Sequence, residues 1–245
     1  MGTNYFGITD IGMKRKTNQD CFKTAEIDDR LILLVVCDGM GGAAGGSEAS
    51  NLAAETFVGY VQKHINPENK KDYLRIFESA LGEANGAVCR KASGERTLEG
   101  MGTTLVAALY DGNSYYCLWV GDSRIYALTK DGLVQISHDH SFVQTLVDNG
   151  SITVQEAKNH PNRNIITKAV GTDEHISCDV CKIDADDFDG VLLCSDGLCG
   201  YVDESDIYNI CASETEVEKC CEKLVRKAND NGGPDNITVI IHRKQ

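Results

Sequence analysis

The sequence contains little proline and no long hydrophobic run. Only 3 of its 245 residues are proline, while 42% are hydrophobic and 25% are charged, as in an ordinary packed globular protein. This composition excludes a fibrous or disordered chain. No stretch approaches the ~20 consecutive apolar residues of a membrane-spanning helix, and the first residues lack a basic segment followed by an apolar one. We therefore expect neither membrane insertion nor secretion.

Positive charge is also scarce relative to negative charge. The chain has 24 lysine and arginine residues against 37 aspartate and glutamate residues, a formal net charge of −13. Such a charge repels nucleic acid and anionic lipid and attracts cations. We therefore expect no nucleic-acid partner.

The 11 cysteines follow neither a disulfide nor a zinc pattern. Their number is odd, and many lie inside apolar runs such as LVVCDG, YYCLWV and VLLCSDG. This placement predicts reduced, buried thiols in a cytoplasmic protein. Cys178 and Cys181 form a CxxC pair, but no second pair lies at zinc spacing. Because residues three apart on an extended segment face opposite sides, we do not expect a zinc site there.

Apolar runs of strand length predict antiparallel sheets. They occur at residues 31–37, 103–110, 114–120, 191–195 and 237–241. Asp111-Gly112-Asn113 supplies turn chemistry between the second and third run, and residues 130–132 do so between 123–129 and 133–136. Hairpins at these turns pair neighbouring strands antiparallel.

Helical spacing occurs in consecutive segments that do not alternate with strands. Residues 47–96 predict two helices divided at Pro67, and residues 203–230 predict one or two more. This order favours a layered α+β fold over a doubly wound parallel sheet. We expect one domain over residues 1–245, in which the polar, weakly periodic residues 138–170 form a mobile flap.

Four aspartates lie at the ends of predicted strands, next to glycine or another small turn residue. They are Asp38, Asp122, Asp196 and Asp235. Any one alone is best explained as a turn aspartate that caps its neighbours. Four carboxylates gathered at one end of a sheet repel one another, so they must bind protons or cations. Oxygen ligands without histidine or thiolate favour Mg²⁺ or Mn²⁺, and Gly39 would let its backbone carbonyl approach such an ion.

A second group of polar residues lies near the start of the chain. Arg15 is followed by Asn18 and Asp20. Arginine is the best bidentate partner for phosphate oxygens, although Arg15 alone is better explained as a solvated surface charge.

Six motifs in order resemble the metal-dependent type 2C protein phosphatases, particularly the short bacterial members. They are RKTNQD at 15–20, VVCDGMGGAAGGSEAS at 35–50, GMGTTL at 100–105, WVGDSR at 119–124, LLCSDGL at 192–198 and GGPDNITVI at 232–240. HPNRNIITKAVG at 160–171 is similar to the segment that follows the flap in that family. The resemblance implies a four-layer α-β-β-α sandwich, with two central antiparallel sheets flanked by helix pairs.

The resemblance also implies roles for individual residues at a site with two metal ions. Asp38 would bridge the two ions, Asp196 and Asp235 would complete the first, and the carbonyl of Gly39 would bind the second. Asp20 would hold the second ion through water.

Two further roles follow from the same motif match. Asp122, with Asp196, matches the pair that binds a third ion in bacterial relatives. Arg15 matches the residue that grips the substrate phosphate, so Arg15 and Asp38 would be the catalytic residues.

The activity implied is hydrolysis of phosphoserine and phosphothreonine esters by a water or hydroxide that bridges two Mn²⁺ or Mg²⁺ ions. Such a pair of ions activates water and neutralises the phosphoryl oxygens, so no protein nucleophile is required. The partners implied are phosphoprotein substrates and a bacterial Ser/Thr kinase as the opposing enzyme. We expect a monomer.

Other functions fit the sequence less well. GMGGAA at 39–44 fits a dinucleotide-binding loop, but a second helix follows its helix where a strand is required. The Cys-x5-Arg match from Cys220 to Arg226 lies in a helical pattern without glycine, unlike a cysteine phosphatase loop. A relative that binds phosphoproteins without catalysis should lack at least one metal carboxylate, and none is missing.

The sequence departs from the family at the positions where relatives carry a histidine. Animal members of the family carry histidine directly after the Asp-Gly, and many bacterial members carry it after the Gly-Gly. Here those positions are Met40 and Ala43. His138 and His140 could be metal ligands on one side of a strand, but the sequence favours a hydrogen-bonding role beside Asp139.

Overall fold

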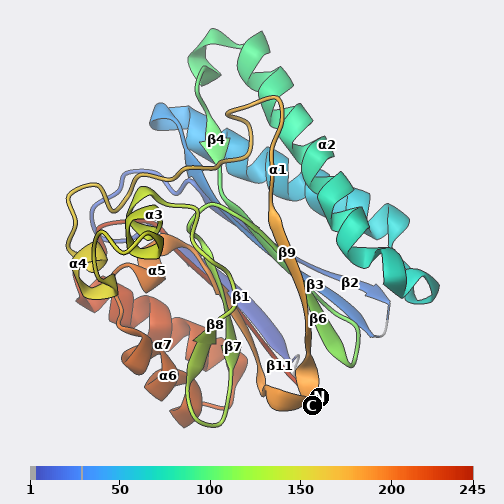
Figure 1. Ribbon diagram of the computed structural model, residues 1–245, viewed down its shortest axis with the longest axis vertical. Helices are drawn as coiled ribbons and strands as arrows, with labels where there is room; N and C mark the ends of the chain where they lie inside the picture. The colour runs from blue at the N-terminus through green and yellow to red at the C-terminus, as the bar shows by residue number, and fades with distance from the viewer. Residues whose placement is uncertain (1–3, 29, 245) are drawn as a thin grey trace.

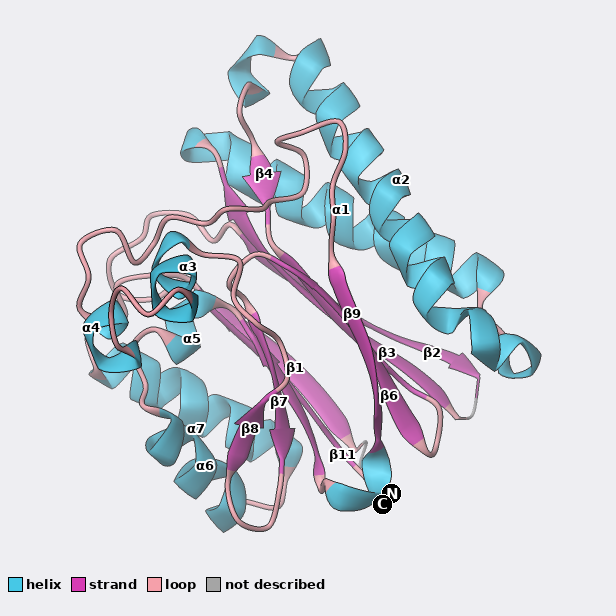
Figure 2. Ribbon diagram, viewed as in Figure 1, coloured by secondary structure: helices cyan, strands magenta, loops and turns pink. Residues whose placement is uncertain are grey.

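The structure is a computed structural model that describes residues 4–28 and 30–244. Within these residues the strands form two sheets, and every strand pair is antiparallel (Figures 1 and 2). The five-stranded sheet has the order β1 (Tyr5–Asp10), β11 (Ile237–Arg243), β10 (Gly190–Cys194), β7 (Arg124–Leu128) and β8 (Leu133–Gln135). The six-stranded sheet has the order β2 (Asp20–Asp28), β3 (Leu31–Met40), β5 (Leu105–Tyr110), β6 (Ser114–Val120) and β9 (Asp179–Asp184), with β4 (Gly102–Thr103) paired to β3.

Helices cover the outer face of each sheet. Long helices α1 (Gly42–His64) and α2 (Tyr73–Gly94) lie on the six-stranded sheet, while α6 (Glu204–Ser213) and α7 (Val217–Asp230) lie on the five-stranded sheet (Figure 2). Shorter helices are α3 (Phe142–Asp148), α4 (Val154–Lys158) and α5 (Asp196–Cys199), with 3₁₀ turns at Pro67–Asp72, Arg96–Leu98 and Ala185–Asp187. The predicted four-layer α-β-β-α sandwich is confirmed.

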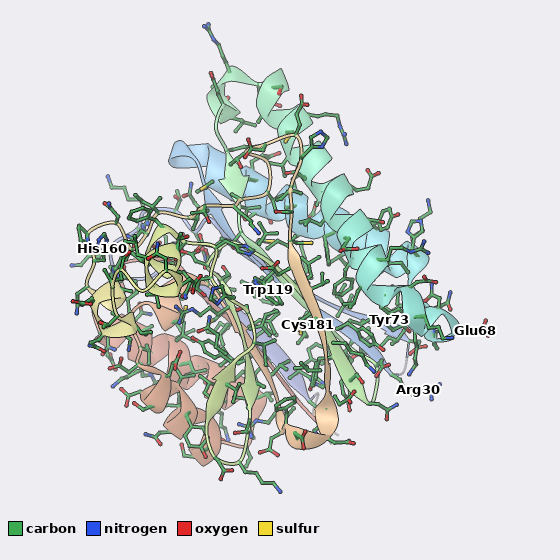
Figure 3. The ribbon with its side chains drawn as sticks, in the orientation of Figure 1. Arg30, Glu68, Tyr73, Trp119, His160 and Cys181 are labelled. Carbon is green, nitrogen blue, oxygen red and sulfur yellow. The ribbon has the colours of Figure 1, made fainter. Side chains whose placement is uncertain are left out.

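Three apolar layers hold this sandwich together. One lies between the α1–α2 pair and its sheet and includes Phe57, Tyr73 and Phe77. The second lies between the two sheets, where Trp119 and Cys181 are seen among the inner side chains (Figure 3). The third lies under α6 and α7. Burial of apolar surface in each layer is the main stabilising contribution.

The cysteines match the sequence prediction in part. All 11 are free thiols, but Cys89, Cys178, Cys181 and Cys199 are partly exposed and the other seven are buried. Cys178 packs with the layer under α1 and α2, whereas Cys181 packs between the sheets. The two residues therefore face opposite sides of the sheet, as expected for β9.

Most predicted elements are confirmed, with shifted ends. The 114–120 strand is reproduced as β6, and hairpins form at residues 111–113 and 130–132. The run predicted as one strand at 103–110 is divided into β4 and β5. Helix α1 begins at Gly42, before the predicted start at residue 47. Glycine is a poor helix former, so the GGAAGG segment gave no sequence signal for the first turn of this helix.

The rival folds are not observed in the described part of the chain. After β3, α1 leads to α2 and then to β4, so no parallel strand follows the glycine-rich loop. Cys220 and Arg226 lie inside α7. No helix among the described residues combines the length and hydrophobicity that crossing a membrane requires.

Candidate active site

One cavity of about 490 Å³ lies where strand ends of the two sheets meet. Its walls include most of the site residues predicted from the sequence: Arg15, Asp38, Gly39, Asp122, Asp196 and Asp235. Asp20 is the exception, because it does not line this cavity. Met40 lines the cavity too, while Ala43 lies among the residues whose side chains the structure does not describe.

Asp38 is held by the backbone around it. It lies near the end of β3. Its backbone N–H donates to the hydroxyl of Thr104 (2.9 Å), and its carbonyl accepts from the hydroxyl of Thr103 (2.9 Å). The backbone N–H of Thr104 also donates to that carbonyl (2.8 Å). The GMGTTL motif therefore fixes the main chain of Asp38.

Gly39 is required for close packing of main chains. A Cβ atom at this position would lie 2.0 Å from the carbonyl oxygen of Gly46 in α1 and 2.5 Å from that of Gln19. No side chain can be accommodated there without backbone movement. From the sequence, glycine was expected at this position so that its carbonyl could approach a metal ion. The structure adds a second reason, which is the close contact with the backbone of α1.

Asp20 lies beside Asp38 but deeper in the protein. The two are cross-strand partners in β2 and β3. One carboxylate oxygen of Asp20 accepts hydrogen bonds from the hydroxyls of Ser195 and Thr238, both at 2.7 Å. Its other oxygen is buried without a hydrogen-bond partner. Asp20 therefore brings a nearly inaccessible carboxylate against the wall of the cavity.

Asp196 and Asp235 come from the five-stranded sheet. Asp196 follows β10 and opens the short helix α5, while Asp235 precedes β11. The Nη2 atom of Arg15 lies 2.8 Å from a carboxylate oxygen of Asp235, and the Arg15 side chain is half exposed. One oxygen of Asp196 is buried without a hydrogen-bond partner. In the described site, one carboxylate is thus paired with a guanidinium, while the negative charge of Asp196 has no hydrogen-bonded positive partner at its buried oxygen.

Asp122 lies on the loop between β6 and β7. Gly121 before it has a φ of 100°, in the left-handed region that favours glycine. A Cβ atom on Gly121 would lie 2.5 Å from the side chain of Thr104. The loop that carries Asp122 therefore packs directly on the residue that holds Asp38.

Burial and mutual repulsion perturb the carboxylates. Burial, opposed by the hydroxyls of Ser195 and Thr238, raises the pKa of Asp20 to about 7. Burial and the charge of Asp235 raise the pKa of Asp196 to about 6. For Asp38 and Asp122, burial and then neighbouring aspartates raise the pKa well above its ordinary value. Carboxylates in this state bind protons or cations.

The donor set suits a hard divalent ion. The buried, unpartnered oxygens of Asp20 and Asp196 need a positive partner. The nearby donors are carboxylate and carbonyl oxygens, which Mg²⁺ and Mn²⁺ prefer. In residues 4–28 and 30–244, no group of three or more His, Cys, Asp or Glu side chains is already arranged to hold a metal ion. Mg²⁺ usually keeps several waters and takes only one or two carboxylates, so a protein site for it does not need three preformed side-chain ligands.

Several residues that build the site were not singled out from the sequence. Thr103 and Thr104 hold Asp38, and Ser195 and Thr238 hold Asp20. The side chain of Asn236 accepts from the backbone of Gln19 and donates to two carbonyls of the 11–17 loop. All five are small polar residues inside the motifs quoted above, which was the signal present in the sequence.

The two histidines make hydrogen bonds, although not with Asp139. His138 bonds to Asp148 (2.8 Å) and His140 to Asp179 (2.9 Å). Asp139 binds Arg124 instead. Neither histidine is among the residues that line the cavity. The hydrogen-bonding role favoured by the sequence is therefore confirmed, with different partners.

Comparison with known proteins finds bacterial phosphatases over nearly the whole chain. The protein named "Serine/threonine phosphatase stp" of Listeria innocua is 34% identical over 233 residues, which is 95% of this chain and 92% of that protein. The crystal structure of the serine/threonine phosphatase Stp1 from Staphylococcus aureus superposes with a TM-score of 0.92 at 34% identity, covering 100% of this chain and 96% of that one.

A second solved structure carries metal ions. It is the catalytic domain of the serine/threonine protein phosphatase PstP in complex with two manganese ions, with a TM-score of 0.84 at 34% identity over 98% of this chain and 96% of that one. Residues 13–237 match the family described as protein phosphatase 2C. With this match and a structural likeness that extends over the whole chain, the protein belongs to the protein phosphatase 2C family and is similar to its bacterial members.

Proposed function

We propose that the chain is a protein serine/threonine phosphatase that hydrolyses phosphoserine and phosphothreonine esters with two divalent metal ions. The observation that carries the proposal is the gathering of buried aspartates with raised pKa values around one cavity that Arg15 also lines. Family membership supports a phosphatase, and the names of the relatives support serine and threonine phosphoesters. The manganese-bound neighbour supports a divalent ion such as Mn²⁺ or Mg²⁺.

The residues proposed to hold the ions are those at the strand ends. Asp38 would contact both ions, Asp196 and Asp235 one of them, and the Gly39 carbonyl and Asp20 the other. The ions would supply a water of lowered pKa and would neutralise charge on the phosphoryl oxygens. Thr103 and Thr104 would keep the main chain of Asp38 in place during turnover.

Arg15 is proposed to bind the substrate phosphate. Its guanidinium lies on Asp235 at the cavity wall and is half exposed, so it can reach an incoming anion. A guanidinium has five N–H donors, and the contact with Asp235 uses one of them. Asp235 would then orient Arg15 toward the phosphate.

Asp122 is proposed to hold a third ion together with Asp196. Met40 places no imidazole beside Gly39, so protonation of the leaving oxygen depends on another group. We connect Asp122 with that step, because a serine or threonine alkoxide needs a proton whereas p-nitrophenolate leaves without one.

The remaining proposals concern the setting of the enzyme. We propose phosphoprotein substrates, a bacterial Ser/Thr kinase as the opposing enzyme, and a monomer. We propose one domain over residues 1–245 with a flap at 138–170. A cytoplasmic location is supported by the 11 free thiols.

The deciding experiment measures phosphate release from a phosphothreonine peptide with Mn²⁺, without it, and with a chelator. Release that depends on Mn²⁺ and stops with chelator is the expected result. No release at any metal concentration would refute the proposal. The same assay on Asp122→Ala, repeated with p-nitrophenyl phosphate, should show a much larger loss on the peptide, and equal losses would exclude Asp122 from leaving-group protonation.

A further inference from the structure

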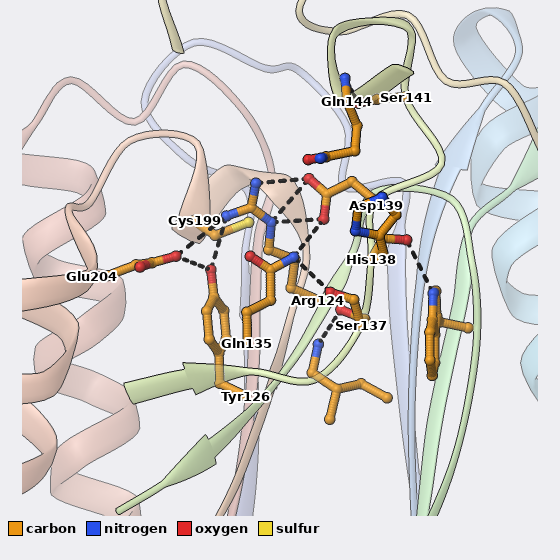
Figure 4. A network of polar contacts seen from close by, with 12 residues as sticks. Arg124, Tyr126, Gln135, Ser137, His138, Asp139, Ser141, Gln144, Cys199 and Glu204 are labelled. Atoms are coloured by element: carbon orange, nitrogen blue, oxygen red, sulfur yellow. Dashed lines mark hydrogen bonds and ion pairs between the residues drawn. The ribbon is translucent and has the colours of Figure 1, made fainter. Parts of the chain in front are cut away.

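Residues 137–140, where the proposed flap begins, contact the strands on both sides of the loop that carries Asp122. The backbone N–H of Ile125 donates to the hydroxyl of Ser137 (2.9 Å), and the indole N–H of Trp119 donates to the carbonyl of His138 (3.0 Å). Figure 4 draws the contacts of Ser137 and His138 together with Asp139. We call the side chains of Ser137, Asp139 and His140 the brace.

Asp139 fixes the segment after Asp122. Its carboxylate accepts from the Nε (2.9 and 3.0 Å) and Nη2 (2.7 Å) atoms of Arg124, and from the amide of Gln135 (2.9 Å) (Figure 4). The Arg124 side chain also donates to the hydroxyl of Tyr126 (2.9 Å). A two-pronged arginine–carboxylate pair with both partners largely buried has a defined geometry. The first two residues of β7, Arg124 and Ile125, are therefore both hydrogen-bonded to side chains of the brace.

His140 fixes the residue before Asp122. Its backbone N–H donates to the carbonyl of Gly121 (2.9 Å), and its ring Nδ1 accepts from the backbone N–H of Gly121 (3.2 Å). Both polar groups of Gly121 are thus bound by one residue. Because an N–H can only donate, Nδ1 must be unprotonated, so the ring proton lies on Nε2 and points to Asp179 (2.9 Å).

The surroundings of His140 keep its ring neutral. The ring is buried, and the ammonium of Lys168 lies 3.3 Å from Nε2. Because Nε2 carries the proton, Lys168 acts there as a nearby positive charge and is not a hydrogen-bond partner of the ring. Burial lowers the pKa of His140, the hydrogen bond to Asp179 raises it, and the charge of Lys168 lowers it, with a net lowering. A neutral ring preserves the acceptor that Gly121 needs.

We propose that the brace positions Asp122 for the phosphatase reaction, with His140 as the positioning residue, an inference that rests on the proposed function. Asp122 is flanked by two anchored residues, Gly121 on His140 and Arg124 on Asp139. On its other side the loop packs on Thr104, which binds the backbone of Asp38. The brace thereby sets the separation between Asp122 and the centre of the site.

The test compares two substitutions of His140, each of which keeps one of the two hydrogen bonds of its ring and removes the other. In His140→Asn the amide oxygen replaces Nδ1 and still accepts from Gly121, but the contact with Asp179 is lost. In His140→Gln the longer side chain reaches toward Asp179 and the acceptor for Gly121 is lost. His138→Gln is the matched control, because its ring is exposed and binds Asp148 at the surface.

The expected result is a split between the two variants. His140→Gln should lower kcat on a phosphothreonine peptide about 10- to 100-fold, as for residues that orient a metal-site ligand, with a smaller change in KM. It should also weaken Mn²⁺ binding measured by equilibrium dialysis. His140→Asn should restore most of both quantities, and His138→Gln should match the wild type. A purely structural role would lower the melting temperature equally in both His140 variants and leave kcat of the folded protein unchanged.

Two further measurements keep the inference falsifiable. In the wild type, ¹⁵N NMR of the imidazole should show a proton on Nε2 and none on Nδ1, and a proton on Nδ1 would overturn the inference even if neither variant folds. The Gly121 amide should exchange with solvent faster in His140→Gln than in His140→Asn. If the wild type releases no phosphate, the proposed function fails, whereas wild-type kcat and Mn²⁺ binding in a folded His140→Gln protein refute the positioning role.

Discussion

Asp20 offers a direct test of the electrostatics of the site, through the substitution Asp20→Asn in protein stripped of divalent ions. An asparagine can still accept from the hydroxyls of Ser195 and Thr238, so the packing is kept and the charge is removed. Burial raises the pKa of Asp20 from 3.8 to about 7. The native state therefore binds the proton more tightly than the unfolded state, and stability falls as the pH rises through this range.

The size of the effect follows from this pKa. For a group with a native pKa of about 7, raising the pH from 6 to 8 removes about 1.4 kcal/mol of stability, because the native state loses most of one proton over that interval. In a domain of this size that corresponds to a fall of about 3 to 6 °C in melting temperature. Asp20→Asn should lack this loss.

The assay is urea unfolding of both proteins at pH 6 and pH 8 with a chelator present. His242 changes in the opposite sense, because burial lowers its pKa to about 4 and stability rises as the pH increases toward the unfolded-state value of 6.5. The difference between wild type and Asp20→Asn cancels this contribution. Asp131→Asn, in an exposed turn, is the control and should follow the wild type. If the difference between wild type and Asp20→Asn is the same at both pH values, Asp20 does not carry the buried charge argued here.

Three other substitutions test the centre of the site. Asp38→Asn should keep the fold and lower kcat at least about 100-fold, because the carboxylate proposed to bridge the two ions stabilises both by several kcal/mol and a neutral amide does not. Normal turnover by a folded variant would refute the two-ion mechanism. Arg15→Lys should raise KM about tenfold, because lysine cannot make the two-pronged contact with phosphate, and metal affinity should stay unchanged. If steady-state kinetics show unaltered KM and kcat, Arg15 is only a solvated surface charge. Gly39→Ala should destabilise the protein by about 1 to 3 kcal/mol, measured by urea unfolding, because its Cβ would meet the Gly46 carbonyl at 2.0 Å. Gly59→Ala is the control and should be neutral or stabilising, because a Cβ at this position in α1 meets no atom outside its own helix within 4 Å.

The strand-end aspartates could be predicted because their signal is local. Each lies where an apolar run meets a glycine or small turn residue, and LILLVVCDG and VLLCSDG show both features within nine residues. Asp38 and Asp196 accordingly line the cavity as expected. The resemblance to a family then supplied roles that the residue pattern could not.

The burial of Asp20 could not be predicted, since it depends on distant partners. Ser195 and Thr238 lie 175 and 218 residues away in sequence and come from the other sheet. Nothing near Asp20 indicates that two hydroxyls will bind one of its oxygens and leave the other without a partner. The brace could not be predicted for the same reason, because Gly121 and His140 meet only when the flap segment folds back on the 121–123 loop.

The short helices of the 138–170 segment carried a signal that the periodicity did not show. Thr153 and Glu156 form a capping box at the start of α4, and Ser141 caps α3. The TVQE sequence is a recognised helix start. Helices of five and seven residues are too short for a hydrophobic period, so capping was the only local clue.

The pairing of the first and last strands has a consequence for how the enzyme is made. In the described sheet, β1 pairs only with β11, and Asp10 lies opposite Ile237, across more than two hundred residues. During synthesis β1 leaves the ribosome before β11 and has no strand partner in its sheet until β11 emerges. Asp235 joins the other carboxylates only at that moment. A growing chain can thus complete its α1–α2 half early while the acidic site stays unassembled, so synthesis and the onset of catalysis are separated by the topology itself.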